Sequence, residues 1–146
     1  MRATSQNLFP CVFCSRHSHL PNKTINSPTD GVKPCQIFGK MVLKEGADKE
    51  ALAAALKAYG DASAAAPGQL ACSYGIADDH VIMFETMDSI NAMDIHVGHC
   101  FPHFVKMLPH CEMDTLIGTC DKSELEYWTA VCNAWGAKTA ACHVAI

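Results

Sequence analysis

The order in which strand-like and helix-like segments alternate is the feature of this sequence that most constrains its fold. From Cys35 onward, some segments alternate apolar and polar residues, as strands do, and others repeat apolar residues at helical spacing. The order is strand, helix, strand, strand, helix, strand, followed by a further helix and a short strand. The expected boundaries, in chain order, are 36–44, 48–66, 69–76, 80–86, 90–108, 113–119, 122–135 and 138–146.

This order is typical of the α+β class in its ferredoxin-like, or split βαβ, form: an antiparallel four-stranded sheet with its helices on one face. The strand over 80–86 is the more apolar member of its hairpin, so we expect it at the more central position. Both faces of the strands carry apolar residues, such as Ile37 and Phe38, or Ile82 and Met83. Because the helices can cover only one face, we expect a homodimer formed through the other face of the sheet.

The first 34 residues lack any such period and contain four prolines among turn-forming residues. We therefore expect an irregular N-terminal arm over 1–34 and one domain over 35–146 with a C-terminal helix-strand extension. The arm has no continuous apolar stretch like that of a secretory signal. Its basic and hydroxyl residues, with no acid before Asp30, leave organelle targeting as the alternative to a cytoplasmic location.

Composition excludes several classes of function. The chain is 49% apolar and 18% charged with a formal charge of -4, so it lacks the basic footprint of a nucleic-acid-binding protein. Its apolar runs are too short to span a membrane. Nine cysteines, an odd number, are scattered along the chain, which indicates reduced thiols in a reducing compartment rather than a disulfide framework.

A cluster of histidines is the part of the chain that most resembles a site. His96, His99 and His103 lie within eight residues, and on an unbroken helix they would share one face. Gly98 and Pro102 oppose that arrangement, because both weaken a helix interior. We therefore predict a helix, a short break, and a second helix that begins at Pro102.

Two metal sites are alternatives that the sequence leaves open. The three imidazoles could bind zinc or copper with Cys100 or His110 as a further ligand, although the predicted break opposes this. A second set with zinc-compatible spacing lies in the arm: Cys11, Cys14, His17 and His19. A lone pair of cysteines is a weak signal, and we expect no metal at either place.

Residues 81–96 resemble the signature of the antibiotic-biosynthesis-monooxygenase domain family, which includes quinol monooxygenases. The resemblance rests on Glu85, an acid near the end of the third strand, on His96 eleven residues later, and on the step Pro102-His103-Phe104. It covers about residues 36–120 and implies a dimeric α/β barrel.

The resemblance also implies a monooxygenase without metal or flavin, acting on a small quinol-like or phenol-like aromatic molecule in a pocket between sheet and helices. Such a reaction needs a base, for which a histidine in an apolar pocket is suited. His96 is the first choice, with His103 or His99 as a second proton carrier. Met87 stands where members that oxidise anthrones or degrade haem have tryptophan, which points away from those two activities. The expected pocket walls are Tyr74, Phe84, Phe101 and Phe104.

A non-catalytic homodimer of the same fold, which binds a small ligand or serves as an interaction protein, is the competing hypothesis. In that case the histidines hydrogen-bond the backbone where the helix breaks. Trp128 and Trp135, seven residues apart, are expected to be core residues of the third helix.

Overall fold

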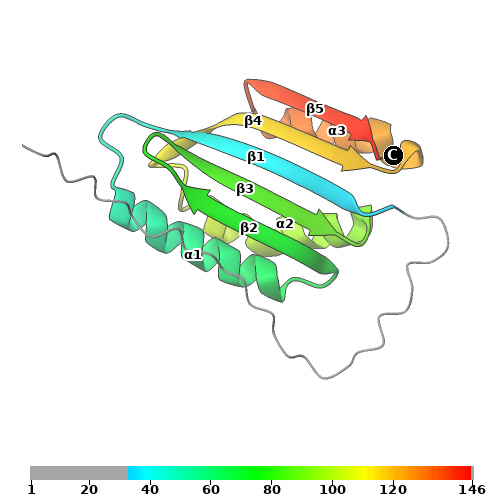
Figure 1. The fold of residues 1–146 in the computed structure, drawn as a ribbon, viewed down its shortest axis with the longest axis horizontal. Coiled ribbons are helices and arrows are strands. Elements are labelled where there is room, and N and C mark those ends of the chain that lie inside the picture. Colours follow the sequence, from blue (N-terminus) through cyan, green and yellow to red (C-terminus); the bar gives the residue numbers. More distant parts are fainter. Residues whose placement is uncertain (1–32, 146) are drawn as a thin grey trace, which may run out of the picture.

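A five-stranded sheet with helices on one of its faces forms the described part of the chain, residues 33–145 of a computed structural model (Figure 1). The predicted order of elements is confirmed. The zinc candidates Cys11, Cys14, His17 and His19, in the arm predicted over 1–34, lie outside the described residues. The elements are β1 (Cys35–Leu43), α1 (Lys49–Ala65), β2 (Gln69–Ile76), β3 (His80–Met87), α2 (Ile90–Phe104), β4 (Cys111–Cys120), the 3-10 turn η1 (Lys122–Glu124), α3 (Leu125–Ala134) and β5 (Thr139–Val144).

The strands lie in the order β2-β3-β1-β4-β5. β3 pairs with β2 and β1, and β1 pairs with β4, all antiparallel, which is the predicted ferredoxin-like arrangement with β3 in a central position. β5 differs, because it pairs with β4 in parallel and makes the complete sheet mixed. The reason is the crossover through η1 and α3, which returns the chain to the end of the sheet where β4 began.

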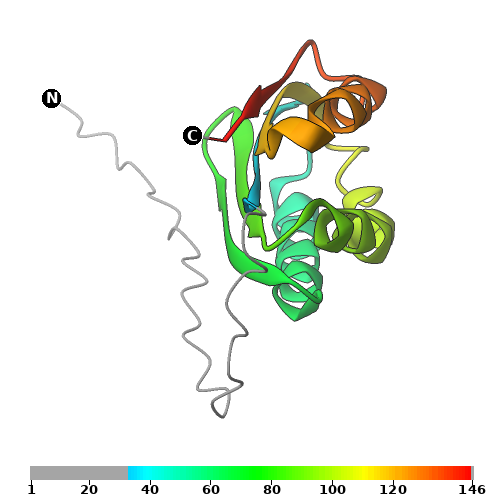
Figure 2. The ribbon, with the colours of Figure 1, turned by 90° about the vertical axis from the view of Figure 1, so that its right-hand side faces the viewer.

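The helices lie on one side of the sheet, and Figure 2 shows the two layers from the side. The alternation of each strand sends every second side chain toward the helices, where the apolar core forms. Among the most buried core residues are Cys35, Met41, Leu52, Val81, Met93 and Trp128. None of the helices within residues 33–145 is long and apolar enough to cross a membrane.

The predicted break in the second helix, α2, is wrong. It runs without interruption through Gly98 and Pro102 and ends at Phe104. Gly98 and Pro102 lie four residues apart on the exposed face of the helix. The Gly98 carbonyl, which Pro102 cannot bond, can therefore bond water, and the proline stands too near the C-terminus to disturb more than the last turn.

The close approach of α3 to β4 depends on Gly118. A Cβ built at this position would meet Trp128 Nε1 and would lie 2.8 Å from Trp128 Cδ1. The buried indole therefore packs directly on the backbone of β4, in space that a side chain would need.

We expect Gly118→Ala to lower the free energy of unfolding by about 1–3 kcal/mol, because the added methyl overpacks this contact. Urea denaturation followed by circular dichroism measures the change. Gly75→Ala in β2 is the matched control, since a Cβ there meets nothing within 4 Å. Equal losses in the two variants would show that the Trp128 contact is not the constraint.

Candidate functional site

A carboxylate lies on the apolar face of the central strand. The alternation of β3 directs Val81, Met83, Glu85 and Met87 toward the helices, and Glu85 is only 5% exposed. A buried charge of this kind needs hydrogen-bonding partners or an opposite charge, because its loss of hydration is costly.

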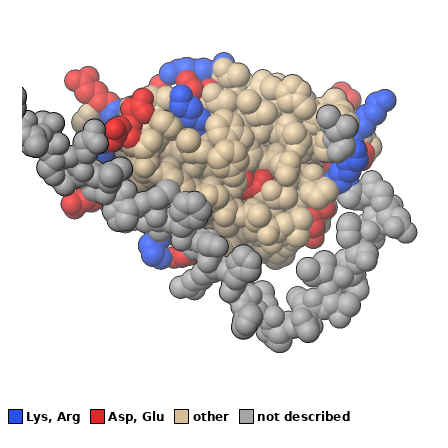
Figure 3. Space-filling model, in the orientation of Figure 1, with Lys and Arg blue, Asp and Glu red and all other residues tan. Residues whose placement is uncertain are grey.

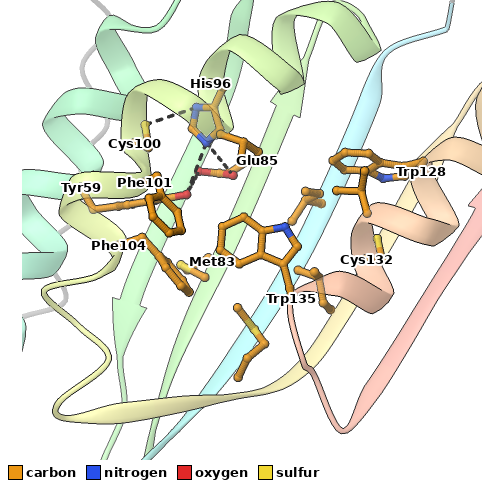
Figure 4. Close-up of a pocket in the computed structure, with 15 residues that line it drawn as sticks. Tyr59, Met83, Glu85, His96, Cys100, Phe101, Phe104, Trp128, Cys132 and Trp135 are labelled. Carbon is orange, nitrogen blue, oxygen red and sulfur yellow. Dashed lines mark hydrogen bonds and ion pairs between the residues drawn. The ribbon is translucent and has the colours of Figure 1, made fainter.

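Partners for Glu85 come from three other elements. His96 of α2 lies with its Nε2 3.1 Å from Glu85 Oε2. On the other carboxylate oxygen, Oε1, the hydroxyls of Tyr59 and Ser63 from α1 donate at 3.1 and 3.3 Å, and the hydroxyl of Tyr74 from β2 lies at 2.5 Å. Figure 4 shows Glu85, His96 and Tyr59 converging at one end of a pocket.

The electrostatics of this cluster favour an ionised carboxylate and neutral tyrosines. Burial raises the pKa of Glu85, but the hydrogen bond and charge of His96, together with the hydroxyls of Tyr74 and Tyr59, outweigh burial and hold that pKa below its ordinary value. Burial, and then the charge of Glu85, raise the pKa values of Tyr59 and Tyr74 well above the ordinary value. Glu85 is therefore an acceptor in this cluster and the two phenols are donors.

This pattern assigns the proton on His96. Because an ionised carboxylate only accepts, His96 Nε2 carries the hydrogen that points to Glu85, and Nδ1 is left outside that contact. The group nearest to Nδ1 is Cys100 Sγ, at 3.6 Å, one helical turn away on α2. Burial, and then the charge of Glu85, raise the pKa of Cys100 to about 12, so its thiol is neutral and a weak donor. His96 Nδ1 therefore lies against a neutral thiol rather than against a charged group.

A pocket between sheet and helices adjoins this cluster. Tyr59, Glu85, His96 and Cys100 line one end, and the rest of the lining is apolar. Trp135 from the end of α3 stands against Phe104, with ring centroids 4.8 Å apart, and against Phe101 at 6.2 Å. The free volume is about 40 Å³, room for a few water molecules. An aromatic ligand can enter only if these side chains move.

Several predicted site residues lie where expected. His96, Phe101 and Phe104 line the pocket, whereas Tyr74, expected as a pocket wall, does not line it and instead belongs to the polar cluster. The structure places these side chains without testing their roles.

Phe84 was predicted wrongly as a pocket wall. It points away from the helices and packs against Phe38 on the outer face of the sheet, with 52% of its surface exposed. The reason is the alternation of β3, in which neighbours of an inward Glu85 must point outward.

The other two histidines of the cluster do not line the pocket. His99 is exposed and lies about 60° around α2 from His96, whereas His103 is half-buried on nearly the same face as His96 but two helical turns farther along the helix. His103 Nδ1 is buried without a hydrogen-bond partner. Within residues 33–145 no three His, Cys, Asp or Glu side chains are arranged to hold a metal ion.

Sequence patterns gave little sign of the remaining site residues. Neither Tyr59 nor Ser63 of α1 was singled out as a site residue. Trp135 was expected in the core and instead closes the pocket. The available signal was Glu85 itself, a charge in phase with the apolar residues of its strand, which calls for hydroxyl or imidazole partners nearby.

Comparison with solved structures identifies the fold. MupZ from Pseudomonas fluorescens superposes with a TM-score of 0.64 at 11% identity, over 75% of this chain and 89% of that one. Rv0793 from Mycobacterium tuberculosis gives 0.52 at 18% identity, over 59% and 92%. A protein named as a candidate antibiotic biosynthesis monooxygenase, from Chloroflexus aurantiacus J-10-fl, gives 0.51 at 19% identity, over 60% and 92%.

These likenesses confirm, at the level of the fold, the resemblance seen in the sequence. No protein-family model and no curated protein matches the chain by sequence.

The buried carboxylate gives a prediction for stability against pH. Because the pKa of Glu85 is lower in the folded protein than in the unfolded chain, its contribution is present above the unfolded value and is lost as pH falls through the folded value. Glu85→Gln should lower the unfolding free energy at pH 7 by roughly 1–3 kcal/mol. The difference from the parent should shrink in acid, as measured by urea denaturation across pH.

Glu45→Gln, in the exposed turn after β1, is the control for that experiment. It should unfold like the parent at every pH. A Glu85→Gln variant whose deficit is unchanged in acid would contradict an ionised Glu85.

Proposed function

We propose that this protein is a cofactor-independent monooxygenase that acts on a small quinol-like or phenol-like aromatic molecule. The observation that carries the proposal is the Glu85–His96 pair, buried at the end of an apolar, aromatic-lined pocket. The candidate monooxygenase among the similar folds supports it. A base oriented by a carboxylate is what proton removal from an aromatic hydroxyl requires.

In the proposed reaction His96 Nδ1 accepts the substrate's hydroxyl proton, and Glu85 holds the ring and stabilises the imidazolium that forms. The electron-rich substrate anion then reduces dioxygen directly. A C–O bond forms at a ring carbon, the O–O bond breaks, and one oxygen leaves as water with the hydrogens lost from substrate. The other oxygen remains as the carbonyl of a quinone.

The apolar walls support this chemistry in two ways. Trp135 and Phe101 exclude water, which strengthens the electrostatic interactions of the pair. Their ring faces and edges also suit contact with an aromatic substrate. Tyr59, whose hydroxyl donates to Glu85 Oε1 and lies 3.3 Å from His96 Nε2, helps to hold the carboxylate and the imidazole in place.

We also propose that the protein is a homodimer joined through the outer face of the sheet. Phe84 and Phe38 stack there with ring centroids 5.0 Å apart, and Phe38 is in register with Ile117 of β4. Where Figure 3 leaves this face uncovered it carries few charged side chains. A second copy of the same face would bury this apolar row.

A non-catalytic ligand-binding homodimer is the second candidate function. Met87, which stands where family members that oxidise anthrones or degrade haem have tryptophan, favours it. Tight binding without turnover is the expected behaviour of that alternative.

Oxygen consumption with a panel of quinols and phenols tests the proposed reaction. We expect the parent to consume oxygen and His96→Ala to lose about 10²–10⁴-fold in kcat, the usual contribution of a general base. His99→Ala, on the exposed face of the same helix, should retain activity. Saturable quenching of tryptophan fluorescence by the quinols, with no oxygen consumed by the parent, would favour the binding protein instead.

Light scattering coupled to size exclusion tests the dimer. We expect the parent to elute as a dimer and Phe84→Glu as a monomer, because two carboxylates would be buried at the interface. Ile95→Glu is the control, since Ile95 is 47% exposed on α2, on the opposite side of the sheet. A monomeric parent, or a dimeric Phe84→Glu, would refute the interface.

A further inference from the structure

Four thiols from four different elements gather beneath the edge of the sheet. They belong to Cys35 of β1, Cys120 of β4, Cys132 of α3 and Cys142 of β5, and each is near enough to another for ionisation of one to raise the pKa of its neighbour. The first three are almost fully buried, and Cys142 alone is partly exposed. The proposed oxidation reaction uses none of them.

Two of these thiols lie in non-bonded contact with each other. Cys120 Sγ and Cys142 Sγ lie 3.5 Å apart, across the parallel pair β4 and β5. A disulfide needs a sulfur separation of about 2.05 Å, so an approach of roughly 1.5 Å would suffice. β5 is the edge strand and pairs only with β4, which gives Cys142 more freedom to move than a central strand would.

We propose that Cys120 and Cys142 are a redox-active dithiol that forms a reversible disulfide with a low-molecular-weight disulfide, such as glutathione disulfide, as the oxidant. Cys142, the accessible member, loses its proton to solvent and attacks one sulfur of the oxidant, forming a mixed disulfide and releasing one thiolate. Cys120 then loses its proton and displaces the second thiolate from Cys142. The protein loses two protons and two electrons, and the oxidant takes them up and becomes two thiols.

The bond would restrain the wall of the pocket. It closes a loop over residues 121–141, and α3 with Trp128 and Trp135 lies inside that loop. Cross-linking the ends of this segment limits the excursions of α3 away from the sheet. Oxidation should therefore slow the opening of the pocket that Trp135 closes.

The surroundings of the pair set the pH at which it reacts. Burial raises the pKa values of both thiols. Near Cys120 the hydrogen bond with Cys142 lowers the pKa and the carboxylates of Glu124 and Asp121 raise it, whereas near Cys142 the thiols of Cys120, Cys132 and Cys35 all raise it. Since the thiolate is the attacking form, oxidation should be slow near neutral pH and faster in alkali.

Peptide mapping of the full chain tests the proposal, in a Cys11→Ser/Cys14→Ser background so that the arm's own pair cannot contribute. After glutathione disulfide and alkylation, trypsin cleavage at Lys122 and Lys138 leaves Cys120 and Cys142 on separate peptides. We expect these peptides to be joined, with a mass about 2 Da below the sum of the masses that have Cys120 and Cys142 as free thiols and Cys111 alkylated, and fragmentation should place the bond at Cys120. Dithiothreitol should reverse the link. The oxidised protein should melt about 5 °C higher and exchange amide hydrogens of α3 more slowly.

Two variants make the result specific. Cys142→Ser should abolish the link, and it tests the pair without altering the fully buried Cys120. Cys132→Ala should still form the link. Stable glutathione attachment at Cys142 with no internal bond, or a bond from Cys142 to Cys35 or Cys132 in its place, would overturn the proposal.

Discussion

The ionised side chain of Glu85 inside the apolar layer is the constraint on which the rest of the structure depends. An unpaired charge there would cost several kcal/mol, so its partners must arrive from elsewhere in the chain. They come from α1, α2 and β2, which fixes the positions of both helices and of the edge strand around β3. Well-packed apolar residues can fill such a space at lower cost, so stability alone does not explain the pair, and the reaction that we propose gives it a use.

The fold was largely predictable because its signals are local. Each strand and each helix is indicated by the spacing of its own apolar residues. The order of these elements is compatible with few topologies. The prediction of a break in α2 was wrong, because the residue types alone do not show which face of a helix is exposed to solvent. Gly98 and Pro102 both face outward, where their cost is small. The parallel placement of β5 likewise depends on the path of α3, which no local pattern records.

The site was less predictable, because it is made of contacts between distant segments. His96 and Glu85 could be paired only through the resemblance, and Tyr59 joins them from a helix that precedes the hairpin. The error at Phe84 was avoidable: with Glu85 in phase with Val81 and Met83, the alternation sends Phe84 to the other face. The inward acid was the stronger signal, and the aromatic residue beside it belongs to the surface that we propose for dimerisation.

The C-terminal extension contributes side chains both to the pocket and to the thiol cluster. Its helix supplies Trp128 and Trp135 to the pocket, and its strand supplies Cys142 to the thiol cluster. A reaction at His96 needs the pocket wall formed by α3 to open for the substrate and to close again against water. The mobility of α3 therefore affects both steps. If the Cys120–Cys142 disulfide restrains α3, then oxidants in solution would control access to His96 through α3 and β5. No change at Glu85 or His96 would be needed.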